Sequence, residues 1–230
     1  MKTIGLLGGI SWQSTLSYYK TINTVVARQL GGLHSAKCLL HSVDFYEIET
    51  RQQSGNWREC ADILGLAALG LQNAGADFMV ICANTMHKVA DEIQARLSVP
   101  VLHIAEVCAD ALLASGIKTA ALLGTRYTMQ QNFYTSRLQN RGLSVLLPGA
   151  GQMEKINAII FDELCRGIVT PASKQYYLEV IQALAEQGAE GIILGCTEIG
   201  LLVQQADTAV PLFDTAEIHA TRAALYALEG

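Results

Sequence analysis

Two short turns of this sequence carry side chains that could move a proton. Residues 83–85 (Ala-Asn-Thr) follow the apolar run Phe78–Cys82, and residues 196–198 (Cys-Thr-Glu) follow Gly191–Leu194. A Gly-Ala pair precedes each segment, so the two align as copies and Cys196 aligns with Ala83. A thiol can accept and return a proton, while amide, hydroxyl and backbone N–H groups can hold a carboxylate. The alignment therefore predicts a proton-transfer site that has one thiol and lacks its counterpart.

Two further segments repeat in the same order along the chain. Lys2–Gly8 matches Lys118–Gly124, and Val99–Leu102 matches Val210–Phe213. Three collinear matches indicate an internal duplication, with copies of about 100 residues each, which is an ordinary domain size. We therefore expect two similar halves that face each other, with Cys196 on one side of a shared cleft and Ala83 on the other.

The cysteine at position 196 is the expected reactive thiol. It stands where a strand passes into a helix, and a helix N-terminus lowers a thiol pKa from about 8.5. Two bases on opposite faces of a Cα–H could remove a proton from one face and return it to the other. Cys82 lies beside Ala83, but side chains alternate along a strand, so we expect Cys82 in the core. The six cysteines form no CxxC pair and no Cys/His spacing, which argues against zinc and against a disulfide framework.

The elements that must position these turns follow from the pattern of apolar residues. Short runs rich in Val, Ile and Leu alternate with helical patterns, as in parallel sheets that are buried on both faces. The predicted strands are Thr3–Leu7, Cys38–Val43, Phe78–Cys82, Val99–His103, Thr119–Leu123, Leu143–Leu147, Gly191–Leu194 and Val210–Phe213. The helices predicted in the second half are Gln130–Asn140, Lys155–Arg166, Ser173–Gln187 and Glu217–Leu228. The predicted fold class is α/β, with two pseudo-symmetric, doubly wound halves. Each has a parallel four-stranded sheet, and the active site lies between them at the carboxyl ends of the strands.

Composition narrows the class of protein further. Half of the 230 residues are hydrophobic and 16% are charged, which excludes a disordered chain, and no apolar run reaches the roughly 18 residues of a membrane span. The net charge is −5 and Lys and Arg form no cluster, so the sequence gives no indication of a basic surface that would bind nucleic acid or an anionic membrane. The chain opens without a signal-type apolar stretch. We expect a soluble cytoplasmic protein with a small-molecule partner.

Three motifs carry a resemblance to a known family. The opening Ile4–Trp12, the central Asn84–His87 and the late Gly195–Glu198 together resemble the cofactor-independent aspartate/glutamate racemases, in particular their enterobacterial broad-specificity members. The resemblance covers essentially the whole chain. It implies a racemase of acidic amino acids with no pyridoxal phosphate, no other cofactor and no metal. It also implies a two-domain fold, for which we expect residues 1–97 plus 215–230 and residues 98–214 as the domains. Separately from the resemblance, the apolar faces of the outer helices are compatible with a homodimer.

The same resemblance implies roles for individual residues. Cys196 is one catalytic acid/base, and position 83 holds the other, normally cysteine and in some close relatives threonine. Alanine has no proton to exchange, so we expect this chain to be impaired in two-base racemisation, as a natural or an engineered variant. The residues expected to bind the α-carboxylate and amine or to line the site are Asn84, Thr85, Thr197, Glu198, Ser11 and Thr125. Arg51 or Gln52, together with Arg166, are the candidates for the side-chain carboxylate, since an arginine fork grips a carboxylate with two hydrogen bonds.

Two other functions stay open at this point. A single late cysteine is also the pattern of a decarboxylase of the same superfold, which the arylmalonate decarboxylases resemble. A cleft without turnover would make a non-catalytic binding protein for acidic amino acids. His87 stands one helical step beyond the turn at 83–85, where we expect a packed, hydrogen-bonded histidine and not a base.

Overall fold

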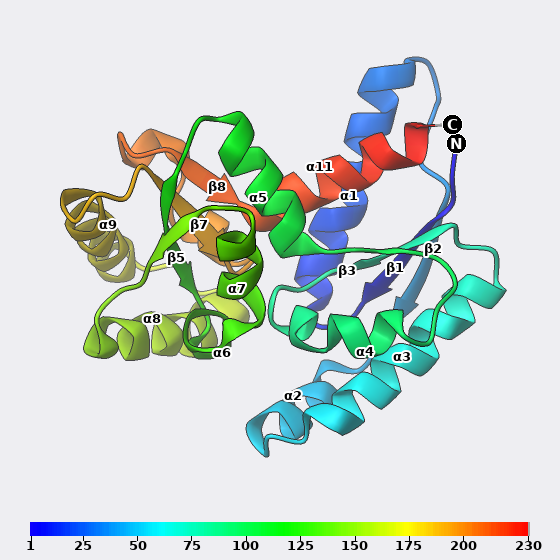
Figure 1. Ribbon diagram of the computed structural model, residues 1–230, viewed down its shortest axis with the longest axis horizontal. Helices are drawn as coiled ribbons and strands as arrows, with labels where there is room; N and C mark the ends of the chain where they lie inside the picture. The colour runs from blue at the N-terminus through cyan, green and yellow to red at the C-terminus, as the bar shows by residue number, and fades with distance from the viewer. Residues whose placement is uncertain (230) are drawn as a thin grey trace. The chain divides into compact units, whose positions relative to one another are not determined.

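The computed structural model describes residues 1–229, and the chain divides into two compact units. Unit 1 consists of Met1–Ile104 and the C-terminal segment that begins at His219, and unit 2 consists of Ala105–Ile218. Each unit contains one sheet of four parallel strands surrounded by helices, which confirms the predicted α/β class (Figure 1). All eight predicted strands overlap an observed strand.

The sheet of unit 1 has the strand order β2-β1-β3-β4. Its strands are β1 (Ile4–Gly8), β2 (Cys38–Ser42), β3 (Phe78–Ile81) and β4 (Val101–Leu102). Every residue of the two central strands, β1 and β3, is buried, whereas β2 at the edge is partly exposed. Continuous apolar runs therefore form the centre of the sheet, as expected for strands that helices cover on both faces.

Helices cover both faces of that sheet. In Figure 1, α1 (Trp12–Leu30) and α11 (Thr215–Leu228) lie on one face, and α3 (Trp57–Asn73) and α4 (Ala90–Gln94) lie on the other. The short α2 (Phe45–Gln53) precedes α3, and the 3-10 helix η1 (Thr85–Val89) follows β3. Side-chain caps set the starts of α2 and α3: Asp44 accepts a hydrogen bond from the Tyr46 N–H, and Asn56 accepts one from the Glu59 N–H.

The sheet of unit 2 repeats the same order, β6-β5-β7-β8. Its strands are β5 (Thr119–Gly124), β6 (Ser144–Leu146), β7 (Gly191–Gly195) and β8 (Leu212–Asp214). The surrounding elements are α5 (Ile104–Ala114), α6 (Arg126–Gln130), α7 (Asn132–Asn140), α8 (Ala150–Asp162), η2 (Leu164–Arg166), α9 (Pro171–Glu186), α10 (Ile199–Leu202) and η3 (Gln205–Asp207). The identical strand order in both units is what a duplicated chain predicts.

The predicted helices of the second half need small corrections. The pattern Lys155–Arg166 predicted one helix, but α8 starts earlier, at Ala150, and ends at Asp162 before the separate turn η2. The early start is supported by Gln152, whose side chain accepts the Gly149 N–H. Small residues at the start of α8 carry little apolar signal, so the pattern placed the start too late.

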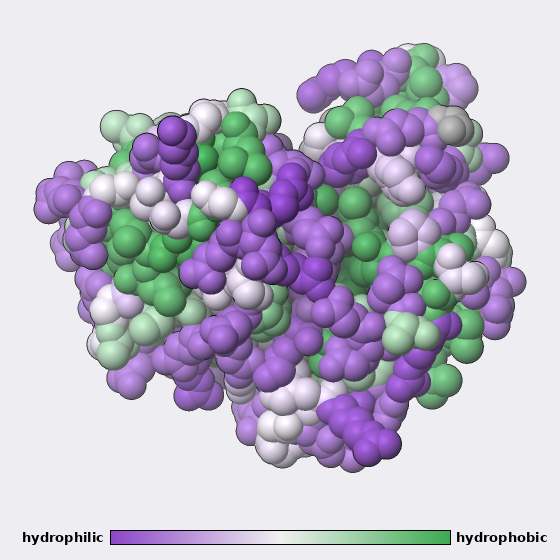
Figure 2. All heavy atoms as spheres, in the orientation of Figure 1, coloured by the Kyte–Doolittle hydropathy of each residue, from purple (hydrophilic) through white to green (hydrophobic). Residues whose placement is uncertain are grey.

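Two further observations concern the described residues 1–229 as a whole. None of their helices combines the length and the apolar composition that a bilayer span requires. Their His, Cys, Asp and Glu side chains form no group of three or more that could hold a metal ion. Figure 2 shows hydrophobic side chains reaching the surface of both units on the face in view, among hydrophilic residues.

Candidate active site

In unit 1, the first and third strands end side by side at one edge of the sheet. β1 and β3 are paired in parallel, with Leu7 opposite Ile81, so the segments that follow them start from the same edge. Ser11 follows β1 and caps α1, accepting the Ser14 N–H at 3.3 Å. It is the one non-glycine residue with positive φ among the described residues, at 83°. A strained, side-chain-capped turn of this kind is frequent at functional sites.

The turn after β3 holds the predicted residues 83–85. Ala83 and Asn84 are buried, and Thr85 is half-buried. Two buried side chains hold the backbone here. Ser14 on α1 donates its hydroxyl to the Cys82 carbonyl at 2.9 Å, and His87 Nδ1 donates to the Ala83 carbonyl at 2.8 Å. Cys82 is fully buried, so the prediction that it is a core residue is confirmed, as is the prediction of a packed, hydrogen-bonded His87.

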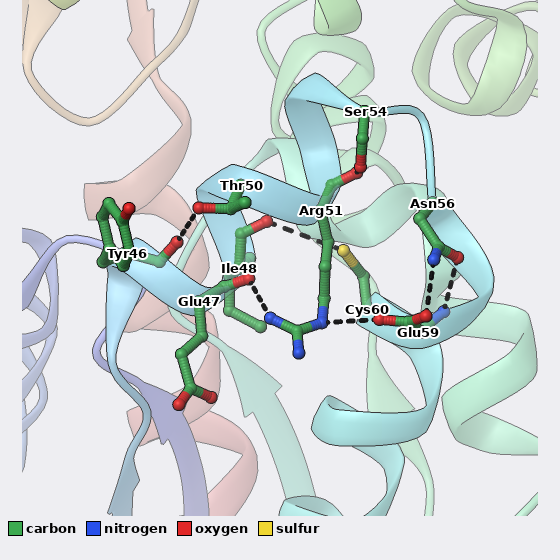
Figure 3. Close-up of polar contacts among 9 residues, drawn as sticks. All are labelled: Tyr46, Glu47, Ile48, Thr50, Arg51, Ser54, Asn56, Glu59 and Cys60. Carbon is green, nitrogen blue, oxygen red and sulfur yellow. Dashed lines mark hydrogen bonds and ion pairs between the residues drawn. The ribbon is translucent and has the colours of Figure 1, made fainter.

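The two candidates on α2 differ in their surroundings. The guanidinium of Arg51 is already engaged, because its Nε donates to Glu59 at 2.9 Å and its Nη1 donates to the Glu47 carbonyl at 2.6 Å (Figure 3). The bond to Glu59 ties α2 to α3. Gln52, the next residue, is buried. Arg51 therefore has a structural explanation, and Gln52 is the better candidate of the pair.

In unit 2, β5 and β7 are the corresponding neighbours, paired from Ala120 opposite Gly191 to Gly124 opposite Gly195. Thr125 follows β5 and caps α6, accepting the Thr128 N–H at 3.3 Å. The two threonine hydroxyls also share a hydrogen bond of 3.1 Å. Thr125 thus occupies the same place in unit 2 that Ser11 occupies in unit 1.

In the turn after β7, two predicted residues donate hydrogen bonds to a carboxylate oxygen of a third. Cys196 Sγ donates to Glu198 Oε2 at 3.0 Å, and the Thr197 hydroxyl donates to the same oxygen at 2.6 Å. Cys196 and Glu198 are buried, at 8% and 7% exposure. The turn therefore holds the thiol and a hydroxyl against one carboxylate oxygen.

The predicted low pKa of Cys196 is wrong for this arrangement. Burial raises the pKa of the thiol well above the ordinary value of 9.0, and the charge of Glu198 and the nearby Cys165 raise it further. The expected helix does little to oppose this, because α10 has only four residues and starts after Glu198. Burial also raises the pKa of Cys165 to about 12. Burial and the neighbouring carboxylate therefore favour the protonated thiol at Cys196.

Arg166 lies on η2, a turn that packs against α10. Its side chain is exposed, and among residues 1–229 its guanidinium forms no ion pair and no hydrogen bond. In this respect it differs from Arg51. A free guanidinium beside the Cys196 turn fits the predicted grip on a carboxylate.

The structure thus gathers the predicted residues in two sets. In unit 1, the segment of Ser11 and residues 83–85 start from one sheet edge, with Gln52 on the neighbouring α2. In unit 2, Thr125 and residues 196–198 start from one edge, with Arg166 on the turn packed against α10. Sequence reasoning missed the role of Ser14 in holding the Cys82 carbonyl. Its position three residues after the cap residue Ser11 was the one signal in the sequence. Sequence reasoning also missed the hydrogen bond between Glu198 and the thiol.

Comparison with known proteins gives a consistent result. The sequence profile of a family described as Asp/Glu/Hydantoin racemase matches residues 7–223. The broad specificity amino-acid racemase RacX of Bacillus subtilis (strain 168) is 31% identical over 151 residues, which are 64% of this chain and 63% of that protein. The glutamate racemase of Koribacter versatilis (strain Ellin345) is 29% identical over 171 residues, 68% of this chain and 56% of that protein. The matched regions thus span less than two thirds of these curated relatives.

Solved structures match over the full chain. A candidate Asp/Glu racemase from Yersinia pestis is 52% identical with a TM-score of 0.95, and both chains are covered completely. An aspartate racemase homologue from Pyrococcus horikoshii OT3 is 35% identical with a TM-score of 0.86, again over 100% of both chains. The glutamate racemase of Francisella tularensis, solved with D-glutamate, is 15% identical with a TM-score of 0.70 over 99% of this chain and 80% of that one, a likeness of fold alone.

Proposed function

Because this chain belongs to the Asp/Glu/hydantoin racemase family, we propose that it is a cofactor-independent isomerase for aspartate or glutamate in which Cys196 exchanges the Cα proton. The names of its relatives support this substrate class, since they include an aspartate racemase homologue, a glutamate racemase and a broad specificity amino-acid racemase.

The observation that carries the proposal is the contact between Cys196 and Glu198. The sulfur lies 3.0 Å from the carboxylate oxygen at the carboxyl end of β7, where ligands of parallel sheets bind. Burial around this pair strengthens every charge interaction within it. A buried thiol held by a carboxylate is a proton donor whose strength depends on the charges that arrive with a substrate.

An amino-acid substrate supplies such a charge. Its α-ammonium group, bound beside Glu198, would offset the negative charge that raises the pKa of Cys196. The thiol can then lose its proton to solvent, and the resulting thiolate takes the Cα proton, leaving a carbanion whose charge the bound α-carboxylate shares. Residues 84, 85 and 197 are the proposed donors to that carboxylate. Return of the proton from the thiol completes the cycle.

Position 83 limits what this cycle can do. Ala83 offers a methyl group, so Cys196 is the one proposed acid/base, and it serves one face of the substrate. We therefore expect exchange of the α-hydrogen of one enantiomer without efficient inversion. A thiol introduced by Ala83→Cys supplies the second acid/base and should produce racemisation.

The test is α-hydrogen exchange in heavy water. Each enantiomer of aspartate and glutamate is incubated with the native protein and with Ala83→Cys, and proton NMR follows the loss of the α-proton while chiral chromatography follows inversion. The native chain should exchange one enantiomer of its substrate and leave the configuration unchanged. Inversion by the native chain as fast as by Ala83→Cys would contradict the proposed role of Cys196 as the one acid/base.

A double variant provides a mirror-image control. Ala83→Cys combined with Cys196→Ala moves the single thiol from the end of β7 to the end of β3. If the two positions serve opposite faces of the substrate, this variant should exchange the other enantiomer. Exchange of the same enantiomer by both single-thiol proteins would show that the two positions do not act from opposite faces.

Arg166 is the proposed contact for the side-chain carboxylate, since Arg51 is held by Glu59. Arg166→Gln should raise the KM for the exchange of aspartate or glutamate with a smaller effect on kcat, because the distal carboxylate is held alike in ground state and transition state. Arg51→Gln is the matched control and should leave KM unchanged. Equal KM values for Arg166→Gln and the native protein would remove Arg166 from the site.

Two outcomes would favour the other functions. Binding of aspartate or glutamate without exchange by any variant would indicate a binding protein. The lone protonated thiol also suits delivery of a proton to a carbanion left by loss of carbon dioxide. Release of carbon dioxide from an arylmalonate by the native protein, abolished by Cys196→Ala, would indicate a decarboxylase.

A further inference from the structure

Three buried histidines of unit 1 form a cluster next to the turn at residue 83. They are His87 on η1, His103 after β4 and His219 on α11, and all three are less than 7% exposed. The ring centroids of His87 and His103 are 4.7 Å apart, and those of His87 and His219 are 5.5 Å apart, both in edge-to-face geometry. His87 is thus wedged between two aromatic neighbours that restrict its rotation.

Hydrogen bonds fix the position of His219. Its Nε2 lies 2.8 Å from the Leu102 carbonyl oxygen, and its Nδ1 lies 2.9 Å from the Tyr18 hydroxyl. A carbonyl can only accept, so Nε2 carries the hydrogen and the neutral ring accepts the tyrosine hydroxyl at Nδ1. The ring against which His87 packs is therefore anchored to β4 and to α1.

His87 donates a hydrogen bond to the turn. Its Nδ1 lies 2.8 Å from the Ala83 carbonyl oxygen, and the same rule places the hydrogen on Nδ1. Burial, followed by the neighbouring His103, lowers the pKa of His87 well below 6.5. The ring is therefore neutral around pH 7, keeps this tautomer and holds the carbonyl without exchanging protons.

Holding the carbonyl of residue 83 also fixes the N–H of residue 84. The C=O and N–H of one trans peptide unit lie in a plane and point in opposite directions. His87 thereby determines where the Asn84 N–H points, and Ser14 does the same for the Ala83 N–H by its bond to the Cys82 carbonyl. Buried side chains thus fix the orientation of two successive peptide units through their carbonyl oxygens.

The aligned turn of unit 2 has no histidine at the position that corresponds to His87. Gly200 stands where the repeat places His87, and the Cys196 carbonyl accepts the Ile199 N–H at 3.1 Å instead. The histidine is thus a feature of the turn at residue 83 alone. A plain backbone bond suffices to close the other turn, so the buried ring is not required by the fold of the repeat.

We propose that His87 is a positioning residue, which aims the backbone N–H of Asn84 at the α-carboxylate of the substrate through its bond to the Ala83 carbonyl. This inference rests on the proposed function, in which residues 84 and 85 hold that carboxylate. His87 itself does not touch the substrate. Its effect is on how well the carboxylate is held, in the ground state and more strongly in the carbanion-like transition state.

The test compares two substitutions that separate the hydrogen bond from the packing. His87→Asn keeps an N–H donor at the Nδ1 position but leaves a cavity, whereas His87→Phe keeps the ring but removes the donor. Aspartate and glutamate binding by calorimetry and α-hydrogen exchange are measured for both, with circular dichroism to verify folding. His87→Phe should weaken binding or slow exchange by about tenfold, and His87→Asn should stay within about threefold of the native protein.

A purely structural role predicts the opposite order, because a cavity harms packing more than a ring of equal size. The inference would be overturned if His87→Asn bound or exchanged the substrate less well than His87→Phe, or if His87→Phe matched the native protein. Either result would leave the proposed function intact. Absence of both binding and exchange in the native protein and in Ala83→Cys would overturn the proposed function and this inference with it. If His87→Phe does not fold, His87→Gln, whose amide extends to the Nε2 position, replaces it with the same expected order.

Discussion

Acid should destabilise unit 1 through the buried His219. This side chain is fully buried, and burial lowers its pKa from 6.5 to about 3, with the nearby His87 adding to the effect. The unfolded chain binds a proton at this residue below about pH 6.5, while the folded chain resists protonation until about pH 3. Stability from this group is therefore complete above pH 6.5 and is lost progressively as the pH falls from 6.5 towards 3.

The magnitude follows from the size of that window. The difference of 3.5 pH units between 6.5 and 3, at about 1.4 kcal/mol per unit, amounts to about 5 kcal/mol. The pKa of His87 is also lowered in the folded protein. With both histidines contributing, the slope of the unfolding free energy against pH approaches about 2.7 kcal/mol per pH unit. A loss of this size is comparable to the whole stability of an ordinary domain.

The assay is urea unfolding between pH 7 and pH 4.5, followed by tryptophan fluorescence. Both tryptophans, Trp12 and Trp57, belong to unit 1, so the signal reports on that unit. His219→Gln should reduce the slope of unfolding free energy against pH by about 1.4 kcal/mol per unit. The matched control is His34→Gln, which makes the same substitution at an exposed histidine. An unchanged slope in His219→Gln would refute the reasoning.

Two other predictions follow from single positions. Gly9 has a φ of +85°, and an added Cβ would overlap the backbone of Val43, so Gly9→Ala should lower the unfolding free energy by more than about 3 kcal/mol in urea titrations. Gly31 has a φ of +71° but open space around it, and Gly31→Ala should cost only about 1 kcal/mol; equal losses would contradict the steric argument. Glu198→Gln removes the charge beside Cys196, so the pKa of that thiol should fall, as read from the pH dependence of its alkylation against a Cys196→Ala background. A thiol titration that does not move would show that burial alone accounts for the raised pKa.

Most of the fold could be predicted from the sequence, because the sheets are built from local apolar runs. The central strands β3 and β7 consist of residues that are all buried, and their sequences, Phe-Met-Val-Ile and Gly-Ile-Ile-Leu-Gly, carry no polar side chain. The duplication repeated the sequence pattern of three strands in each sheet, β1, β3 and β4 in unit 1 and β5, β7 and β8 in unit 2. The sequence pattern misplaced helix ends where small or polar residues carry little apolar signal, as at the start of α8.

The chemistry of the candidate site was less predictable. The sequence located Cys196 at a strand end, but its pKa depends on how deeply the thiol is buried and on a carboxylate two residues away that turns back onto it. The positive φ of Ser11 likewise arises from the tight connection between β1 and α1 and has no signature in the residue type. Packing and backbone direction, which the sequence does not state, determined both.

The last segment of the chain belongs to the first unit, and this has a consequence for its synthesis. From His219 onward the chain completes unit 1: the Tyr226 ring packs edge-on against Phe78 at 4.8 Å between centroids, and the Ala227 carbonyl accepts the N–H of Lys2. Domains usually fold in the order in which the ribosome releases them. Here the nascent N-terminal sheet must wait for the final helix, so unit 2, whose residues are contiguous, is the part that can close first during translation.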